Sequence, residues 1–210
     1  MSVEMLCQLP GGSNAVPQLN YDKQLVTEDC LARDVELGRA FIVANQTGVT
    51  SQAGLSATTP VLSLYNPAGS GITGRLWMVS AHFEVAFAAA ASVWLAVGTN
   101  TVAAAVTGTL TTAHRNLKLG SAGAVAGAQG NRIVPLLAAT LPAAPVAIDL
   151  LGVGLTGAIT TVPALGPMTK WYVSPVLIQP GCNVSVQTST ASGANATLIS
   201  YIWSEIPLIN

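Results

Sequence analysis

Short runs of apolar residues recur along this chain, and turn-forming residues separate them. The most informative stretch covers residues 61–87, where a run of strand formers (61–65) is followed by the turn sequence NPAGSG (66–71) and a longer run (75–87). In the longer run, five large apolar residues take odd positions: Trp77, Val79, Phe83, Val85 and Phe87. This is the two-residue period of a β-strand, and proline and glycine supply turn geometry between the runs. The stretch therefore predicts two strands joined as an antiparallel hairpin.

Similar runs continue on both sides of this stretch. Strands are predicted at residues 41–44, 91–97, 101–110, 133–134, 147–151, 171–178, 183–188 and 196–206. Residues 111–131 are expected to form a long loop, and the prolines between 135 and 145 a link between strands. Short strands at this spacing are typical of an all-β sandwich or barrel. The pattern predicts an antiparallel β-sandwich over residues 41–210.

The last predicted strand has the clearest separation of two faces. One face is expected to carry Leu198, Ser200, Ile202 and Ser204. The other face is expected to carry Ile199, Tyr201, Trp203 and Glu205. Because successive side chains of a strand point to opposite sides, one of these sets should enter the core.

Charged residues concentrate in the first 40 positions, which hold six of the nine acidic and three of the eight basic residues. The drop in charge near Ala40 predicts a boundary between an N-terminal arm (1–40) and the sandwich domain (41–210). A short helix is predicted in the arm, with Thr27 as its N-cap and Gly38 as its C-cap. The alternative is an extended segment that becomes ordered only against a partner.

The low overall charge is the most informative feature of the composition. Half of the residues are hydrophobic and only 8% are charged, whereas a soluble domain is typically about a quarter charged. Such a chain either lies in a membrane or buries its surface against other protein. The uncharged apolar run at residues 85–97 is shorter than the roughly 20 residues of a spanning helix, and turn residues end it. We therefore expect no membrane partner.

Nucleic acid and secretion are not expected either. The net charge of −1 creates no field that would attract a polyanion. Glu4 stands where the basic region of a signal peptide would lie, so synthesis in a cytoplasm is expected. Three scattered cysteines (Cys7, Cys30, Cys182) do not suggest a disulfide framework or a metal site.

Residues with catalytic potential are few. His82 and Glu84 are expected on one face of a strand, where they could act as a base or as two metal ligands. Asp149 and Glu205 are the other carboxylates of the sandwich, and four tryptophans (Trp77, Trp94, Trp171, Trp203) could in principle form a carbohydrate platform. No nucleophile or third ligand accompanies the histidine, so structural roles are favoured. We expect no enzyme activity, no metal and no cofactor.

Two stretches resemble structural proteins of tailed bacteriophages. The first is YNPAGSG at residues 65–71 with the long alternating strand after it. The second begins at the turn of Pro180 and Gly181, continues through a loop of small residues and ends with LISYIWSEIP at residues 198–207. The resemblance covers about residue 55 to the C-terminus. Sequences of that group belong to jelly-roll or β-sandwich virion proteins, so it implies a jelly-roll-like sandwich with an extended N-terminal arm.

The resemblance also implies a function. It suggests a capsid decoration (cement) protein, located on the capsid surface of the virion, that binds the major capsid protein as a homo-oligomer, with a homotrimer as the first expectation. The N-terminal arm is similar to the arms with which cement trimers hold the capsid. The candidate capsid-contact residues in the arm are Leu25, Glu28, Asp29, Leu31, Arg33, Asp34, Glu36 and Arg39.

Two other classes of function stay open. The first is a tail or head-fibre receptor-binding protein, in which aromatic residues of the same sandwich would read a glycan. The second is a small enzyme or lectin-like module that acts on cell-surface sugar. Location in the virion separates the first from a cement protein, and glycan binding or saccharide turnover separates the second.

Overall fold

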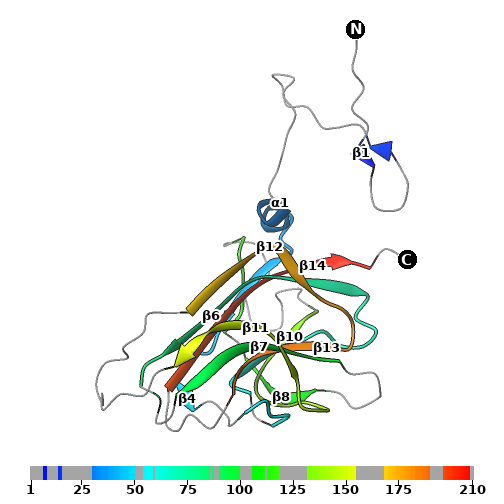
Figure 1. Cartoon of the computed structure of the whole chain (residues 1–210). Helices are drawn as coiled ribbons and strands as arrows, with labels where there is room; N and C mark the ends of the chain where they lie inside the picture. The colour runs from blue at the N-terminus through cyan, green and yellow to red at the C-terminus, as the bar shows by residue number, and fades with distance from the viewer. Residues whose placement is uncertain are drawn as a thin grey trace.

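The alternating runs form two antiparallel β-sheets that pack face to face in the computed structural model of this chain (Figure 1). The structure describes residues 7–8, 14–15, 30–50, 54–58, 60–85, 87, 90–99, 106–111, 113–118, 132–154, 168–189 and 196–208. Near the N-terminus, β1 (Cys7–Gln8) and β2 (Asn14–Ala15) pair with each other. The predicted all-β sandwich is confirmed, because all strand pairs of the two sheets are antiparallel.

The strand order of each sheet defines the fold. The first sheet has the order β12 (Met168–Ile178), β6 (Ile72–Phe83), β14 (Ala196–Pro207), β3 (Ala40–Ala44) and β9 (Arg115–Asn116), and β4 (Val49–Thr50) also pairs with β14. The second sheet has the order β11 (Val146–Gly154), β7 (Ala91–Thr99), β13 (Cys182–Thr188), β5 (Leu62–Tyr65), β10 (Val134–Thr140) and β8 (Thr107–Leu110).

Eight of these strands form a jelly roll. The order β3-β14-β6-β12 faces the order β5-β13-β7-β11, and the chain crosses between the sheets from β5 to β6 to β7 and again from β11 through β14. This is the double Greek key of a jelly roll. Strands β8, β9 and β10 are an insertion between β7 and β11. The insertion extends both sheets on the side of β3 and β5 and leaves β11 and β12 as the two edges of the other side.

The predicted hairpin at residues 61–87 is wrong, because its two strands lie in different sheets. β5 pairs with β10 and β13, whereas β6 pairs with β12 and β14. The glycine-rich turn carries the chain across the sandwich, with positive φ angles of 78° at Gly69 and 71° at Gly71. The strand predicted at 101–110 is confirmed at Thr107–Leu110, and residues 101–105 lie outside the described part.

Buried Asn66 fastens this turn to the second turn that the sequence singles out. Its side-chain amide donates hydrogen bonds to the carbonyl oxygens of Ile72 in β6 (2.9 Å) and Ile178 in β12 (2.8 Å). Its backbone accepts from Gly181 (2.7 Å) and donates to Cys182 (3.0 Å). The two crossings between the sheets therefore lie together and share one asparagine.

A β-bulge in β6 changes which of its residues face the core. Met78 pairs with Ile202 and Leu76 pairs with Trp203, so Trp77 is the extra residue. Val79 faces the core on one side of the bulge and Leu76 on the other. The shared face that the odd positions of Trp77 and Val79 predict is wrong, because a bulge re-aims side chains. Trp77 instead packs on the outer face with Met78 and Ile202.

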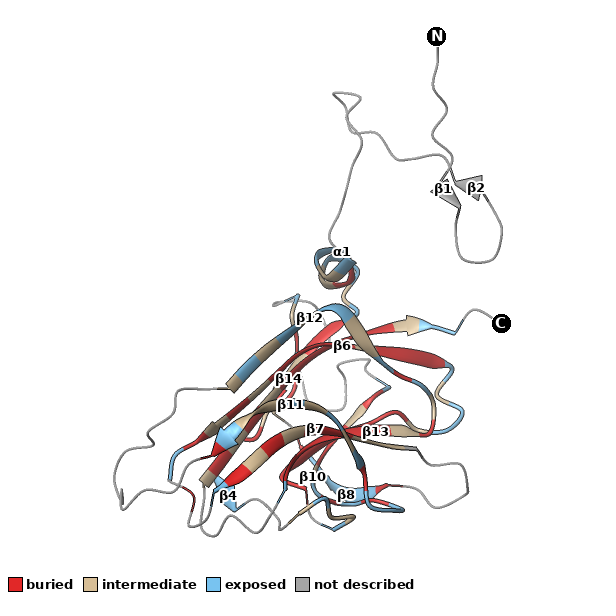
Figure 2. Cartoon of the chain, viewed as in Figure 1, coloured by how far each residue is buried: buried red, intermediate tan, exposed pale blue. Residues whose placement is uncertain are grey.

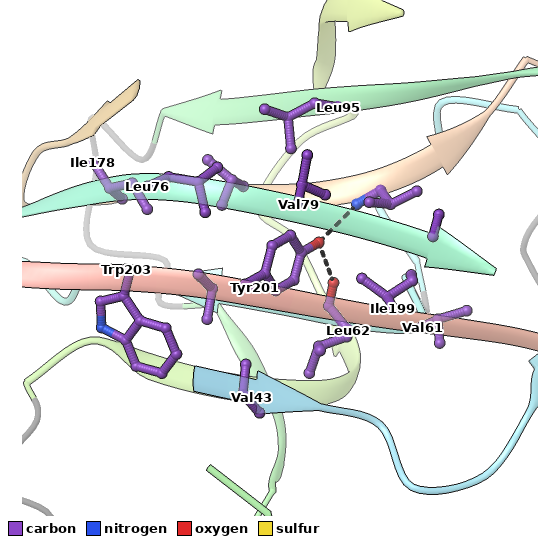
Figure 3. Close-up of a cluster of buried hydrophobic side chains, with 14 of the residues drawn as sticks. Val43, Val61, Leu62, Leu76, Val79, Leu95, Ile178, Ile199, Tyr201 and Trp203 are labelled. Carbon is purple, nitrogen blue, oxygen red and sulfur yellow. Dashed lines mark hydrogen bonds between the residues drawn. The ribbon is translucent and has the colours of Figure 1, made fainter. Parts of the chain in front are cut away.

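A cluster of buried apolar side chains lies between the two sheets, whose central strands are largely red in Figure 2. The faces predicted for the last strand are confirmed there, because Ile199, Tyr201 and Trp203 of β14 join the core and Ile202 faces outward. The hydroxyl of Tyr201, which is 0% exposed, accepts a hydrogen bond from the N–H of Val186 (3.0 Å). It donates one to the carbonyl of Leu62 (3.1 Å), as Figure 3 shows. Burial raises the pKa of this hydroxyl, so it remains a donor.

The single helix of the described residues, α1 (Cys30–Glu36), packs on the outer face of the first sheet (Figure 1). It contacts β3 and β14, and Leu31 packs against the Trp77 cluster. The helix ends in a Schellman motif: Gly38 N donates to Val35 O (2.9 Å), and Arg39 N donates to Asp34 O (2.8 Å). The φ of +69° at Gly38 confirms the predicted glycine C-cap, while Thr27 lies outside the described residues.

Replacing Tyr201 by phenylalanine should lower the free energy of unfolding by about 2–4 kcal/mol, because the N–H of Val186 and the carbonyl of Leu62 lose their shared partner inside the core. Urea unfolding at fixed protein concentration measures the change. Tyr65→Phe is the matched control, since that buried tyrosine lies in a smaller cluster on the outer face of the second sheet. Equal effects of the two substitutions would contradict the bridging role of Tyr201.

Candidate assembly surface

The two sides of the jelly roll at which the sheets end differ in the length of their edge strands. On one side the sheets end in the short strands β8 and β9, of four and two residues. On the other side they end in β11 and β12, of nine and eleven residues, and among the described residues these strands pair only with β7 and β6, respectively. Long unpaired edges offer free backbone donors and acceptors to another chain.

Large apolar side chains gather on these two edge strands. Seven of the thirteen exposed large hydrophobic residues of the described chain belong to them: Val146, Ile148, Leu150 and Val153 on β11, and Trp171, Val173 and Leu177 on β12. Val173 is 102% exposed and Trp171 58%. In Figure 2 both strands are tan and pale blue, whereas β6 and β14 are largely red. We call these seven residues and the strands that carry them the β11/β12 edge surface.

An ion pair joins the two edges. Lys170 Nζ lies 2.6 Å from Asp149 Oδ1, and the Tyr172 hydroxyl donates to Asp149 Oδ2 at 2.8 Å. Burial alone would raise the pKa of Asp149, but the hydrogen bonds from Lys170 and Tyr172 and the charge of Lys170 outweigh it and hold the pKa below its usual range. Burial, followed by the bond to Asp149, raises the pKa of Tyr172. The edge surface therefore contains two opposite charges that neutralise each other.

A second feature of β12 is a break in its pairing with β6. Trp171 pairs with Met78 and the next pair is Val176 with Leu76, so residues 172–175 are unpaired with β6. A groove of about 380 Å³ lies between this break and α1. Its lining residues are Cys30, Arg75, Trp77, Val173, Ser174, Pro175 and Leu177. The groove connects the edge surface with the place where the arm joins the sandwich.

The structure describes five of the eight candidate contact residues of the arm. Asp34 is 5% exposed and faces its own sandwich, and Leu31 is half-buried against it. Arg33, Glu36 and Arg39 are exposed and available to another molecule. Leu25, Glu28 and Asp29 lie outside the described residues.

Asp34 fastens α1 to the sheet. Its carboxylate accepts a hydrogen bond of 2.5 Å from Ser204 Oγ and lies 3.6 Å from Arg75 Nη1. Ser204 Oγ in turn accepts from the indole of Trp77 at 2.9 Å. A buried carboxylate with these partners holds the helix in place. By its packing α1 is therefore part of the sandwich, although the charge pattern of the sequence places it in the N-terminal arm.

The residues with catalytic potential are dispersed. No hydrogen bond links His82 to the exposed Glu84 among the described residues, and the described residues contain no group of three or more metal-ligating side chains. Asp149 is engaged with Lys170, and Glu205 accepts from the backbone of Arg132 and Ile133. Nor do the tryptophans form one platform. Trp203 lies in the core and Trp77 on the outer face under α1, and only Trp171 is exposed.

No helix among the described residues is long and apolar enough to span a bilayer. Comparisons with protein-family models, with curated proteins and with solved structures found no match.

Sequence reasoning did not identify the edge surface, although a signal for it was present. The segment VAIDLLGVG at Val146–Gly154 has large apolar residues at even positions (Val146, Ile148, Leu150) and at odd positions (Leu151, Val153). A strand with one buried face needs apolar residues on that face only. In β11, Leu151 packs against the core while Val146, Ile148, Leu150 and Val153 are exposed, and this excess of large apolar residues is the signal.

Replacing Asp149 by asparagine should lower the free energy of unfolding at pH 7 by about 1–2 kcal/mol, a range reduced because the pair is partly exposed. Since the folded pKa of Asp149 is depressed, its contribution is present above the unfolded pKa of about 3.9 and is lost as the pH falls through the folded pKa. Urea unfolding between pH 2.5 and pH 7 should therefore show the two proteins converging at low pH. Exposed Glu36→Gln is the control, and a constant difference down to pH 2.5 would contradict the ionic role.

Proposed function

We propose that this chain is a structural virion protein of a tailed bacteriophage, which decorates the capsid as a homo-oligomer and stabilises the shell. The observation that carries the proposal is the apolar β11/β12 edge surface on a jelly roll. Jelly rolls are common among viral capsid domains, so the fold is compatible with this role by analogy. A protein that holds a shell together needs contact area rather than turnover.

The edge surface suits contact between copies of the same chain. Its two charges, Lys170 and Asp149, are already paired within the subunit, so two copies would not repel each other there. Large apolar residues flank unpaired strand edges, and obligate interfaces between identical subunits are large and rich in apolar area. Cyclic symmetry would bury this surface in every subunit, and a homotrimer remains our first expectation.

The N-terminal arm is the proposed contact with the major capsid protein at the capsid surface. The residues before α1 hold Leu25, Glu28 and Asp29, and α1 and its exit add exposed Arg33, Glu36 and Arg39. Charges of both signs on an arm can make complementary pairs with a partner. Because Asp34 holds α1 on the sandwich, the part of the arm that can be removed without uncovering Trp77 ends before Cys30.

One observation favours a second candidate, a tail or head-fibre receptor-binding protein that recognises a glycan. Trp171 is a tryptophan with 58% exposure on an edge strand, and jelly rolls also include lectin domains. Electron microscopy of the virion separates the two candidates. Density on capsid three-fold or quasi-three-fold axes would support decoration, and density at the tail would refute it.

Val173→Asp should dissociate the oligomer at micromolar concentration, because it places a charge on the proposed interface. The side chain is 102% exposed, so the folded subunit itself should tolerate the change. Sedimentation velocity measures the mass of the particle. Val49→Asp is the matched control on exposed strand β4 and should leave the mass unchanged. A monomeric wild-type protein, or an unchanged particle mass for Val173→Asp, would contradict the assignment of the β11/β12 edge surface as the oligomer interface.

Removal of residues 1–29 should leave the oligomer intact and weaken binding to capsids that lack the protein, because Leu25, Glu28 and Asp29 are lost while Arg33, Glu36 and Arg39 remain. The cut leaves α1, Asp34 and the covered Trp77 cluster in place. Co-sedimentation with such capsids measures occupancy, and the full chain is the positive control. Full occupancy by the shortened protein would show that the removed part of the arm is not the capsid contact.

A further inference from the structure

A pocket of about 240 Å³ lies where the chain leaves α1 and enters the first sheet. Apolar residues from three strands of that sheet line it: Phe41 of β3, Ile72 at the start of β6 and Pro207 at the end of β14. Two arginines that are far apart in sequence, Arg39 and Arg132, also line it.

The carboxylate of Glu205, 7% exposed, lies in the wall of this pocket and is committed to the backbone. It accepts from the N–H of Arg132 at 3.0 and 2.8 Å and from the N–H of Ile133 at 2.9 Å. The indole of Trp203 donates to it at 3.2 Å. Burial raises the pKa of Glu205, against the effect of these donors. Glu205 therefore acts as an anchor that holds the backbone of Arg132 at the pocket.

The two guanidinium groups have unused hydrogen-bonding capacity. Arg132 Nη1 donates to the carbonyl of Ser70 at 2.9 Å, and the other N–H groups of its guanidinium have no hydrogen-bond partner among the described residues. The side chain of Arg39 is exposed and forms no ion pair with a described residue. Two cations and one buried carboxylate leave the pocket with an excess positive charge.

The chemistry of the lining selects a class of ligand. Arginine forks pair with carboxylates through two parallel hydrogen bonds. Pro207 is exposed, and with the small exposed parts of Phe41 and Ile72 it forms the apolar part of the pocket wall. A carboxylate on a short hydrocarbon can satisfy both parts, whereas inorganic phosphate has no apolar part to place against this wall. We propose that the Arg39/Arg132 pocket binds a carboxylate carried on a short hydrocarbon chain.

Two sources could supply this group: a small organic acid in solution, or the acidic side chain of another copy of this protein. The pocket would bind the same chemistry in both cases. The proposal does not depend on the capsid-decoration function, because a small-molecule probe tests it on the isolated full-length protein.

The test is a titration of the full-length protein with sodium butyrate at constant ionic strength, followed by saturation-transfer NMR of the butyrate methyl group. Saturable binding is expected, with no comparable binding of butyramide, which has the same shape without the charge. Arg39→Gln and Arg132→Gln should each weaken binding about tenfold or more through the loss of a charge-assisted hydrogen bond. Arg33→Gln is the matched control, since Arg33 is exposed on α1 outside the pocket, and should change binding less than twofold.

Three results would overturn the proposal: equal binding of butyramide and butyrate, unchanged binding by Arg39→Gln, or tighter binding of inorganic phosphate than of butyrate at the same arginines. Because Arg39 is exposed, the Arg39→Gln protein should fold normally. Its butyrate affinity therefore tests the proposal even if Arg132→Gln does not fold. Sedimentation velocity in saturating butyrate then separates the sources. Dissociation would identify an acidic side chain of a second copy, and an unchanged mass would identify a soluble acid.

Discussion

A buried tyrosine hydroxyl that serves two strands at once is the contact on which the sandwich depends. β5 and β13 pair as far as Ser63 and Ser185, and the Tyr201 hydroxyl then bridges the carbonyl of Leu62 and the N–H of Val186. Tyr201 belongs to β14 in the opposite sheet, so this bridge fixes the register of one sheet against the other (Figure 3). Dispersion and apolar burial are not directional, and a buried hydrogen bond supplies the specificity that they lack.

A second buried side chain, Asn66, holds the two crossings between the sheets together. Asn66 holds the ends of β6 and β12 through two carbonyls, and its own backbone bonds to the turn that leads into β13. β12 runs along the outside of β6, and β11 lies at the corresponding edge of the facing sheet. The long apolar edges are therefore a result of the topology, and the Asp149–Lys170 pair joins them without leaving a net charge.

Much of the fold could be predicted from alternation, but pairing could not. The faces of β14 follow directly from its two-residue period, and Gly38 marks the end of α1. A glycine-rich turn satisfies the same backbone angles in a hairpin and in a crossing between sheets, so the turn at 66–71 did not reveal the partners of β5 and β6. The bulge at Trp77 inserts one residue into β6, and the alternation of apolar residues along the sequence does not show where such an insertion occurs. For the candidate site, the inward direction of Asp34 depends on Ser204, which lies 170 residues away.

The insertion of β8, β9 and β10 has a consequence for how large an assembly can grow. It leaves short strands at one side of the jelly roll and the long bare edges at the other. A particle with adhesive strands at both ends can add neighbours indefinitely and form fibres. In the proposed oligomer, a single adhesive side on each subunit would limit growth to a small closed assembly.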